Sequence, residues 1–184
     1  MKKHNLAFID LETTGLDPDK QEMIELGCVV ARQVANPSGR GAKLELVSEF
    51  DLKIKPEHIE TAEPDALRIN GYNSGDWLFA ADLPQALKLL NEKAEGAMMI
   101  SHNITFDWSF LERAFIKTKM QNKLASVRLD ILSMAFAKLY HDPKIQRFNL
   151  RALTEYFGLK NDQAHTALAD IKVTVEIYKK LLEI

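Results

Sequence analysis

An apolar segment near the start of the chain runs directly into two carboxylates and a turn, in the stretch Phe8-Ile9-Asp10-Leu11-Glu12-Thr13-Thr14-Gly15. The residues Leu6–Leu11 predict a short buried β-strand that ends at this turn. Side chains alternate along a strand, so Asp10 and Glu12 point to one face while Leu11 points to the other. Two like charges at a buried strand end repel each other and lose hydration, and a divalent cation would relieve both penalties. Taken alone, the pair is equally consistent with loop carboxylates that cap a neighbouring group.

The residues that follow predict a mixed β-sheet flanked by helices. Met23–Val34 and Lys43–Lys55 are apolar and β-branched, and the turn cluster at 36–41 between them predicts a hairpin. Further strands are predicted at Ala97–Ser101 and Ala125–Leu129, and helices at Ala62–Ile69, Leu83–Ala94, 105–119, 130–140, Asn149–Phe157 and Ala167–Leu182. This order indicates an α/β layer fold whose sheet is antiparallel at the hairpin and parallel elsewhere. Sites in such sheets lie at the carboxyl ends of strands, where polar clusters at 10–12 and 102–107 are expected.

Length and composition indicate one domain, 1–184, with a sizeable core. No apolar run approaches the roughly 18 residues that span a bilayer, and no secretory signal is recognisable. A cytoplasmic protein with no membrane partner is therefore expected. The single cysteine, Cys28, excludes an internal disulfide and a Cys-rich zinc site. The net charge of −2 argues against a broad basic face for long duplexes, but not against a nucleic-acid enzyme, because a carboxylate cluster becomes positive once it binds divalent cations.

Two later segments carry further candidate residues. Asp107 is expected in the first turn of a helix, where the helix dipole alone would favour a carboxylate, and Asn103 is a candidate cap of that helix. His165 and Asp170 are five residues apart, which corresponds to a rotation of about 140° on a continuous helix. They converge only if Asp170 lies on the last helix and His165 on the loop before it, as would suit a general base beside a carboxylate ligand. Separately, each segment is also explained by a solvated helix start.

Together, the carboxylates Asp10, Glu12, Asp107 and Asp170 form the pattern of a two-metal site, with ions roughly 3.5–4 Å apart. Oxygen-only ligands favour Mg²⁺ or Mn²⁺ over zinc. One ion would activate water, the other would stabilise the leaving 3′ oxygen, and His165 would take the proton of the attacking water. Phosphoryl transfer requires little else, because its catalysis is mainly positioning and charge neutralisation.

The sequence resembles the DEDDh (DnaQ-like) exonuclease family, which includes the proofreading subunit of bacterial DNA polymerase III, ribonuclease T and oligoribonuclease. The resemblance extends from about Leu6 to Leu182 and rests on three motifs in order: Phe8–Leu16, His102–Asp107 and His165–Asp170. It implies a ribonuclease-H-like fold, two Mg²⁺ ions that Mn²⁺ can replace, and release of 5′-mononucleotides from a 3′ end. It also implies that Asp10 bridges both metals.

The resemblance further implies contacts with the terminal nucleotide. The segment after the first acids maps to Thr13 and Leu16, and Leu16 is expected to wedge against the last base. Asp65 and Asn70 lie in a segment that resembles the one before the family's His-Gly-Ile, which is replaced here by a triplet that begins at Asn70. Both side chains are candidates to hydrogen-bond the nucleotide.

These features predict a 3′–5′ exonuclease acting on single-stranded DNA. Two alternatives are an exoribonuclease that trims RNA ends or short oligonucleotides, and a non-catalytic nucleic-acid-binding domain on the same fold. The presence of all four carboxylates and His165 counts against the non-catalytic alternative. The sequence given ends at the last predicted helix, without the tail with which the polymerase subunit binds its polymerase, so a stand-alone nuclease, or one whose partner binds elsewhere, is expected. A polymerase or homodimer partner is nevertheless considered.

Two weaker candidates lie near the second motif. Lys117, Lys119 and Lys123, with Arg128 nearby, are basic enough to guide a phosphate backbone, although a solvated helix end explains them better. Asp130 follows a predicted apolar strand and is a candidate to support the site without contacting substrate.

Overall fold

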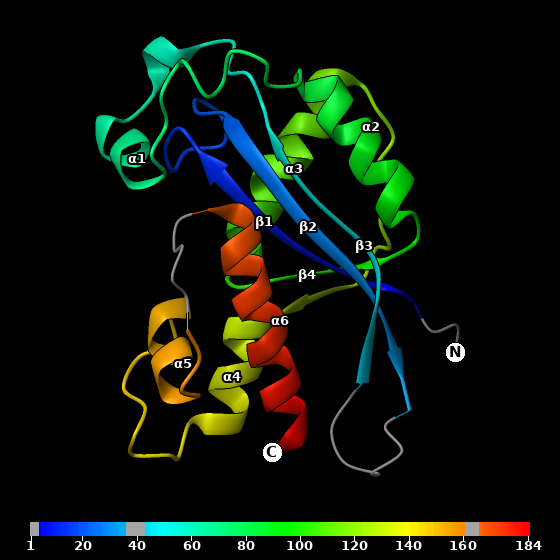
Figure 1. The fold of residues 1–184 in the computed structure, drawn as a ribbon, viewed down its shortest axis with the longest axis vertical. Helices are drawn as coiled ribbons and strands as arrows, with labels where there is room; N and C mark the ends of the chain where they lie inside the picture. The colour runs from blue at the N-terminus through cyan, green and yellow to red at the C-terminus, as the bar shows by residue number, and fades with distance from the viewer. Residues whose placement is uncertain (1–3, 36–42, 161–165) are drawn as a thin grey trace.

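The computed structural model describes residues 4–35, 43–160 and 166–184, which build a five-stranded mixed β-sheet with helices on both faces (Figure 1). The strands are β1 (Leu6–Thr13), β2 (Met23–Val34), β3 (Lys43–Lys53), β4 (Met98–Ser101) and β5 (Arg128–Asp130). Their order in the sheet is β3-β2-β1-β4-β5. The helices are α1 (Pro64–Ile69), α2 (Leu83–Ala94), α3 (Ile104–Thr118), α4 (Ile131–Leu139), α5 (Leu150–Tyr156) and α6 (Ala167–Glu183), and a 3₁₀ turn covers Ile59–Thr61.

The strand pairing confirms the predicted hairpin and corrects the expectation for β1. β2 pairs antiparallel with β3, while β4 pairs parallel with β1 and β5 parallel with β4. β1 and β2 are also antiparallel, so the prediction of parallel pairing everywhere outside the hairpin is wrong. The physical reason is the short connection at 14–22, because a parallel crossover requires a dozen or more residues.

One predicted strand is shorter and later than expected. The sequence predicts Ala125–Leu129, whereas β5 contains only Arg128–Asp130. β4 is itself four residues long, and its ladder with β5 begins at the pair Met99 and Arg128. The earlier residue Ala125 instead donates a single backbone hydrogen bond of 2.9 Å to the carbonyl of Ala97.

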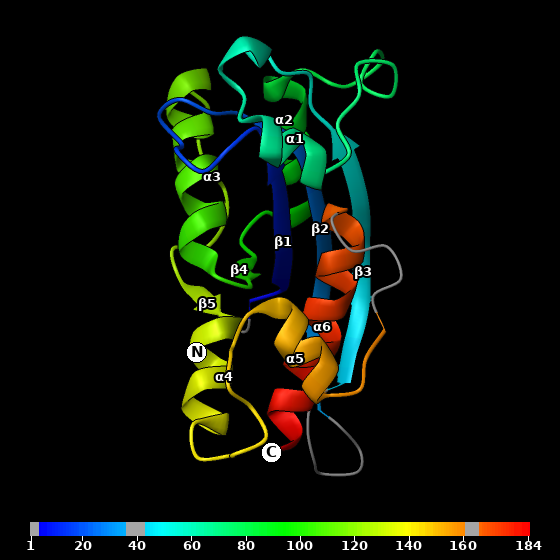
Figure 2. The same cartoon turned by 90° about the vertical axis from the view of Figure 1, so that its left-hand side faces the viewer.

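Helices lie against both faces of the sheet (Figure 2), and each face has its own layer of apolar side chains. Ala7, Ile9 and Leu11 of β1 belong to the layer that includes α2 and α3. Leu6 and Phe8, from the alternate positions, belong to the layer that includes α4, α5 and α6. The period-two alternation of β1 thus assigns each of its side chains to one layer. Within the described ranges, every helix is too short or too polar to serve as a membrane span.

Candidate active site

Asp10 and Glu12 lie at the carboxyl end of β1, on the face of the sheet that α6 covers. Leu6 and Phe8 precede them on this face and pack in the core against α6, so the alternation of the strand carries the two acids to the same side. Both acids are half-buried, and Leu11 between them belongs to the opposite layer, as predicted. One face of β1 therefore has an apolar half and an acidic half.

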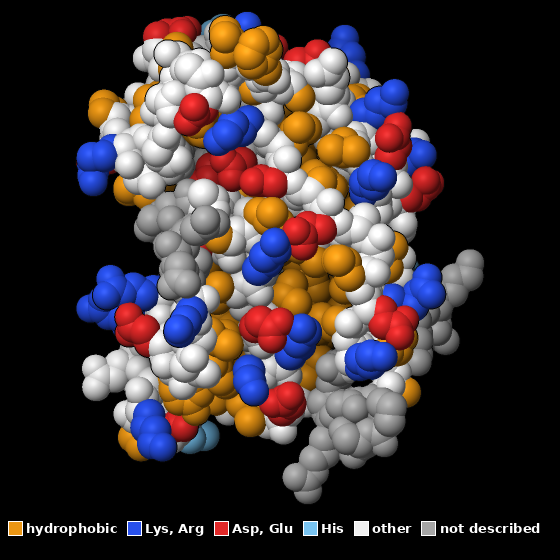
Figure 3. Space-filling view, in the orientation of Figure 1, with side chains coloured by type: hydrophobic (Ala, Val, Ile, Leu, Met, Phe, Trp, Pro, Cys, Tyr) orange, Lys and Arg blue, Asp and Glu red, His pale blue; other side chains and the backbone are white. Residues whose placement is uncertain are grey.

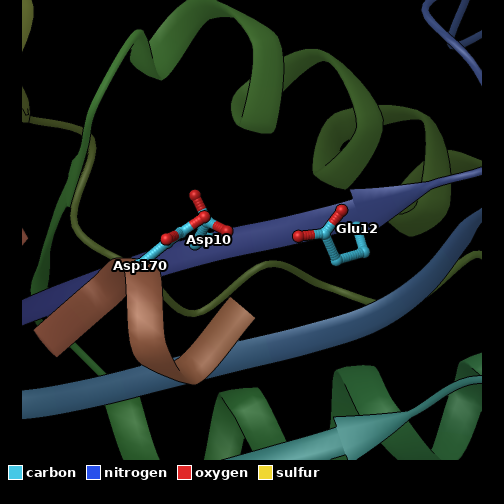
Figure 4. A group of neighbouring side chains, drawn as sticks. All are labelled: Asp10, Glu12 and Asp170. Atoms are coloured by element: carbon cyan, nitrogen blue, oxygen red, sulfur yellow. The ribbon is translucent and has the colours of Figure 1, made fainter. Parts of the chain in front are cut away.

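Asp170, in the first turn of α6, completes a group of three carboxylates (Figure 4). One oxygen atom from each of Asp10, Glu12 and Asp170 lies within 4.8 Å of the others. The helix approaches the sheet closely because Gly27 of β2 lies beneath it. A Cβ at this position would lie 2.9 Å from the backbone carbon of Ala167. The convergence of the first and third motifs is thus a property of this fold.

Burial and mutual repulsion raise the pKa values of these acids. Burial, and then the negative charges of Asp107 and Glu12, raise the pKa of Asp10 well above its usual range. Burial, followed by the charges of Glu25 and Asp170, raises the pKa of Glu12 to about 8. At neutral pH the cluster therefore retains protons in the absence of a cation. A divalent cation would displace these protons, because it compensates the charge that burial disfavours.

Asp107 lies outside this group and has hydrogen bonds of its own. Its side chain is 2% exposed at the start of α3, where Oδ1 accepts a 3.1 Å hydrogen bond from the backbone N–H of Leu11 and Oδ2 accepts one from the Ser101 hydroxyl. Burial raises its pKa to about 7, although the hydrogen bonds from Ser101 and Leu11 act in the opposite direction. Its charge raises the pKa of Asp10, so Asp107 lies within electrostatic reach of the group without belonging to it.

The donor set fits a hard divalent cation. Within the described ranges, the only group of clustered metal-ligating side chains consists of Asp10, Glu12 and Asp170, and it contains neither sulfur nor imidazole. Carboxylate oxygens suit Mg²⁺ and Mn²⁺ and disfavour zinc, which prefers nitrogen and sulfur ligands. His165, the predicted general base, lies outside the described residues, and its role stays a prediction.

The residues predicted to contact the nucleotide gather around the turn after β1. The Thr13 side chain is buried and donates to the carbonyl of Gly15 at 2.7 Å, so its hydroxyl is used within the turn. Leu16 is 74% exposed and available to a ligand. Asn70 joins α1 to this turn, since its Nδ2 donates to the carbonyl of Thr13 at 3.0 Å. Asp65 is also exposed, on α1, and pairs with Arg68 at 3.3 Å.

Two further residues that the sequence singled out, Asp130 and Lys117, have different environments in the structure. Asp130 accepts hydrogen bonds of 2.9 and 3.1 Å from the backbone N–H groups of Asn103 and Ile104, and thereby supports the start of the helix that carries Asp107. This geometry agrees with its predicted supporting role. Lys117 forms ion pairs with Glu22 and Glu57, in keeping with the solvated alternative.

Two further residues, Glu25 and His102, interact electrostatically with the acids and were not predicted from the sequence. Glu25 is a lone carboxylate in the apolar strand β2, and this isolation was the available signal. His102 stands in the second motif, but nothing in the sequence separated it from the neighbouring Asn103. Burial lowers the pKa of His102, against the opposing charges of Asp130 and Asp170, and its ring nitrogens have no hydrogen-bond partner among the described residues. His102 is therefore a neutral imidazole within electrostatic reach of Asp170.

Solved structures support the predicted architecture. E. coli Exonuclease I in complex with a dT13 oligonucleotide superposes with a TM-score of 0.75 at 17% identity, over 97% of this chain and 41% of that protein. At this identity the likeness establishes the fold alone. It confirms the predicted ribonuclease-H-like architecture with a mixed sheet flanked by helices.

The sequence relatives are larger proteins, and this chain matches only a part of each. The PolC-type DNA polymerase III of Caldanaerobacter subterraneus subsp. tengcongensis is 30% identical over 180 residues, covering 96% of this chain and 11% of the polymerase. The 3′–5′ exonuclease DinG of Staphylococcus epidermidis is 28% identical over 181 residues, covering 96% of this chain and 18% of DinG. The chain thus spans less than a fifth of either relative. The model of the exonuclease family RNase_T matches residues 7–178, nearly the whole chain. The chain belongs to this DnaQ-like exonuclease family.

Proposed function

We propose that this chain is a 3′–5′ exonuclease that hydrolyses the terminal phosphodiester bond of single-stranded DNA and releases 5′-mononucleotides. The observation that carries the proposal is the convergence of Asp10, Glu12 and Asp170 within 4.8 Å on one face of the sheet. Three partly buried acids of like charge destabilise a protein unless a cation or protons neutralise them. Such an arrangement is better explained by metal binding than by stability.

In this proposal Asp10, Glu12, Asp107 and Asp170 hold two Mg²⁺ ions, which Mn²⁺ can replace. When bound, the ions supply an activated water and neutralise charge on the leaving 3′ oxygen. Asp10 lies beside Asp170 in Figure 4, and the charges of Asp107, Glu12 and Asp170 all raise its pKa, so Asp10 is the acid that would be shared by both ions. The hydrogen bonds from Leu11 and Ser101 fix the Asp107 carboxylate before any cation binds.

His165 acts as the general base that accepts the proton of the attacking water. In the sequence it directly precedes Thr166, the N-cap residue of α6, and α6 carries Asp170. The exposed Leu16 contacts the last base, an apolar contact that tolerates any sequence. Asp65 and Asn70 bind the terminal nucleotide from the side of α1. Thr13 belongs to the turn after β1 that supports this nucleotide.

The comparisons favour DNA as the substrate. The similar proteins include DNA polymerases of the PolC type and Exonuclease I in complex with dT13. The test uses matched 5′-labelled single-stranded DNA and RNA oligonucleotides with Mg²⁺, Mn²⁺ or EDTA. A stepwise ladder on DNA that EDTA abolishes is the expected result. A ladder mainly on RNA would keep the mechanism but indicate a role in RNA turnover. No ladder with either metal would indicate a non-catalytic nucleic-acid-binding domain.

A protein partner is part of the same proposal. The PolC-type relatives join a matching region to a polymerase within one chain, so a polymerase is the expected kind of partner. A homodimer is the alternative. Light scattering of the purified chain, alone and after addition of a DNA polymerase from the same cell, separates the two.

A further inference from the structure

Glu25 of β2 is a buried carboxylate that the mechanism above does not use. Its side chain is 3% exposed, and its register partner across the ladder is Glu12 of β1. Burial of a carboxylate is costly unless the group is paired and hydrogen-bonded. The partners of Glu25 therefore indicate what it does.

One carboxylate oxygen of Glu25 holds the first residue of α6. Oε1 accepts a 3.0 Å hydrogen bond from the backbone N–H of Ala167, 142 residues away along the chain. The first N–H groups of a helix have no partner within the helix, and a negative charge is favoured there. The side chain of Thr166, at the N-cap position, makes no capping hydrogen bond. The sheet thus supplies to α6 the acceptor that a local cap would otherwise provide.

The other oxygen of Glu25 forms an ion pair. Lys53 of β3 places its Nζ 3.6 Å from Glu25 Oε2 and 3.6 Å from the ring centroid of Trp77. The indole N–H of Trp77 in turn donates to the carbonyl of Ile24 at 2.8 Å. Both carboxylate oxygens of Glu25 therefore have partners, as expected of a side chain that holds the start of α6 in place.

The contact lies one turn from the candidate metal ligand. Asp170 is three residues after Ala167, in the first turn of α6. Gly27 lies two residues after Glu25 on the same face of β2. Because it has no side chain, the backbone of α6 can approach the strand closely at this position. Contact at Gly27 limits how near α6 comes, and the hydrogen bond at Glu25 prevents its first turn from moving away.

We propose that Glu25 is a positioning residue, whose hydrogen bond to Ala167 sets the place of Asp170 relative to Asp10 and Glu12. This inference rests on the proposed function, since it assumes that these three acids bind the metal. Glu25 touches neither substrate nor ion in this account. It acts through α6 alone.

Two conservative variants distinguish the effect of the length of the Glu25 side chain from the effect of its charge. Glu25→Gln keeps an oxygen at the same distance and loses the charge. Glu25→Asp keeps the charge and shortens the side chain by one carbon–carbon bond, about 1.5 Å, so the oxygen no longer reaches Ala167. Mn²⁺ binding is measured by electron paramagnetic resonance and calorimetry, with the unfolding midpoint of each variant determined in parallel.

Glu25→Asp is expected to lose about 10- to 100-fold in Mn²⁺ affinity, the usual effect of removing a group that orients a ligand, while Glu25→Gln stays near wild type. The Mg²⁺ concentration for half-maximal hydrolysis should rise in parallel, with an unchanged KM for the oligonucleotide. The matched controls are Glu49→Asp and Glu49→Gln. Glu49 also joins the sheet to α6, through Lys172 at 2.9 Å, but is partly exposed, so its replacement should change affinity less than about fivefold.

The opposite ranking would overturn the inference. A tenfold loss of Mn²⁺ affinity in Glu25→Gln would show that the charge of Glu25, and not its hydrogen bond, controls metal binding. This conclusion holds whether or not Glu25→Asp folds. Wild-type affinity in both variants shows that Glu25 does not position the site. A wild-type protein that binds no Mn²⁺ and cleaves no oligonucleotide refutes the proposed function itself, and is thus distinct from a failure in the variants alone.

Discussion

The two halves of the face that α6 covers differ in chemistry although one helix and one strand build both. Phe8 is fully buried and its ring meets that of Tyr178 edge to face, with centroids 5.4 Å apart. Asp10, the next residue on this face, stands against Asp170 instead. In Figure 3, acidic side chains gather just above the start of α6, and apolar side chains are exposed lower down, between α6 and β3. The apolar half stabilises the docking of the helix, and that docking brings the acids together.

The residues that stabilise the fold and those proposed to bind metal are therefore neighbours on one face of β1, since Phe8 is followed on that face by Asp10. Apolar burial is the main favourable term in folding, and the acidic half opposes it until a cation is bound. Substitutions in the two halves should therefore have opposite effects on the metal-free protein.

The largest effect is expected from Asp10→Asn. Removal of the shared ligand should lower hydrolysis by at least about 10⁴-fold, the scale seen when one member of a catalytic unit is lost. Without metal, the same variant should unfold at a higher temperature than wild type, because one source of repulsion is gone. Single-turnover cleavage of a labelled oligonucleotide and thermal unfolding in EDTA measure the two effects, with Glu49→Gln as control. Near-normal turnover would refute the metal assignment.

His165→Ala should have the next largest effect on the reaction. The rate should fall about 10²- to 10⁴-fold, the usual contribution of a general base, while Mn²⁺ affinity remains unchanged. Cleavage kinetics and calorimetry on the same preparation test this pair of expectations. If the variant lost metal affinity instead, His165 would be a ligand and not a base.

In the apolar half, Phe8→Ala should destabilise the fold by about 3–5 kcal/mol, because it leaves a cavity and removes the contact with Tyr178. The folded fraction should retain its metal affinity, since the acids are unchanged. Urea unfolding with added Mn²⁺ measures both quantities. A loss of less than about 1 kcal/mol would show that this half does not fix α6.

The last effect, which requires no substitution, is a pH dependence of stability in EDTA. The pKa of Glu12 is raised to about 8 in the folded protein, chiefly by burial, and that of Asp107 to about 7. Above about pH 4.5 the unfolded chain has lost these protons, whereas the folded chain keeps that of Asp107 up to about pH 7 and that of Glu12 up to about pH 8. The free energy of unfolding therefore falls as the pH rises through this range. Saturating Mg²⁺ should reduce this fall. Unfolding midpoints from pH 5 to 8 that are flat in EDTA would contradict the pKa shifts.

Local rules predicted much of the fold and part of the site. The period of two in β1 placed Asp10 and Glu12 together, and their proximity to Asp170 agrees with the expected convergence of the motifs. The bond from Leu11 to Asp107 and that from Ala167 to Glu25 join residues 96 and 142 positions apart, and no local pattern reports such contacts. The extent of β5 depends on the length of its neighbour β4, which is also a tertiary property. The DnaQ-like family itself was recognisable from the spacing of three motifs, and the family match confirms it.

Calorimetric titration of the metal-free wild-type chain with Mn²⁺, beside Asp10→Asn, tests most directly whether the acidic half of the α6-covered face is a metal site. We expect two bound ions in wild type, release of protons on binding at pH 7, and loss of at least one ion in the variant. Equal binding in both chains, or none in wild type at millimolar Mn²⁺, would contradict it.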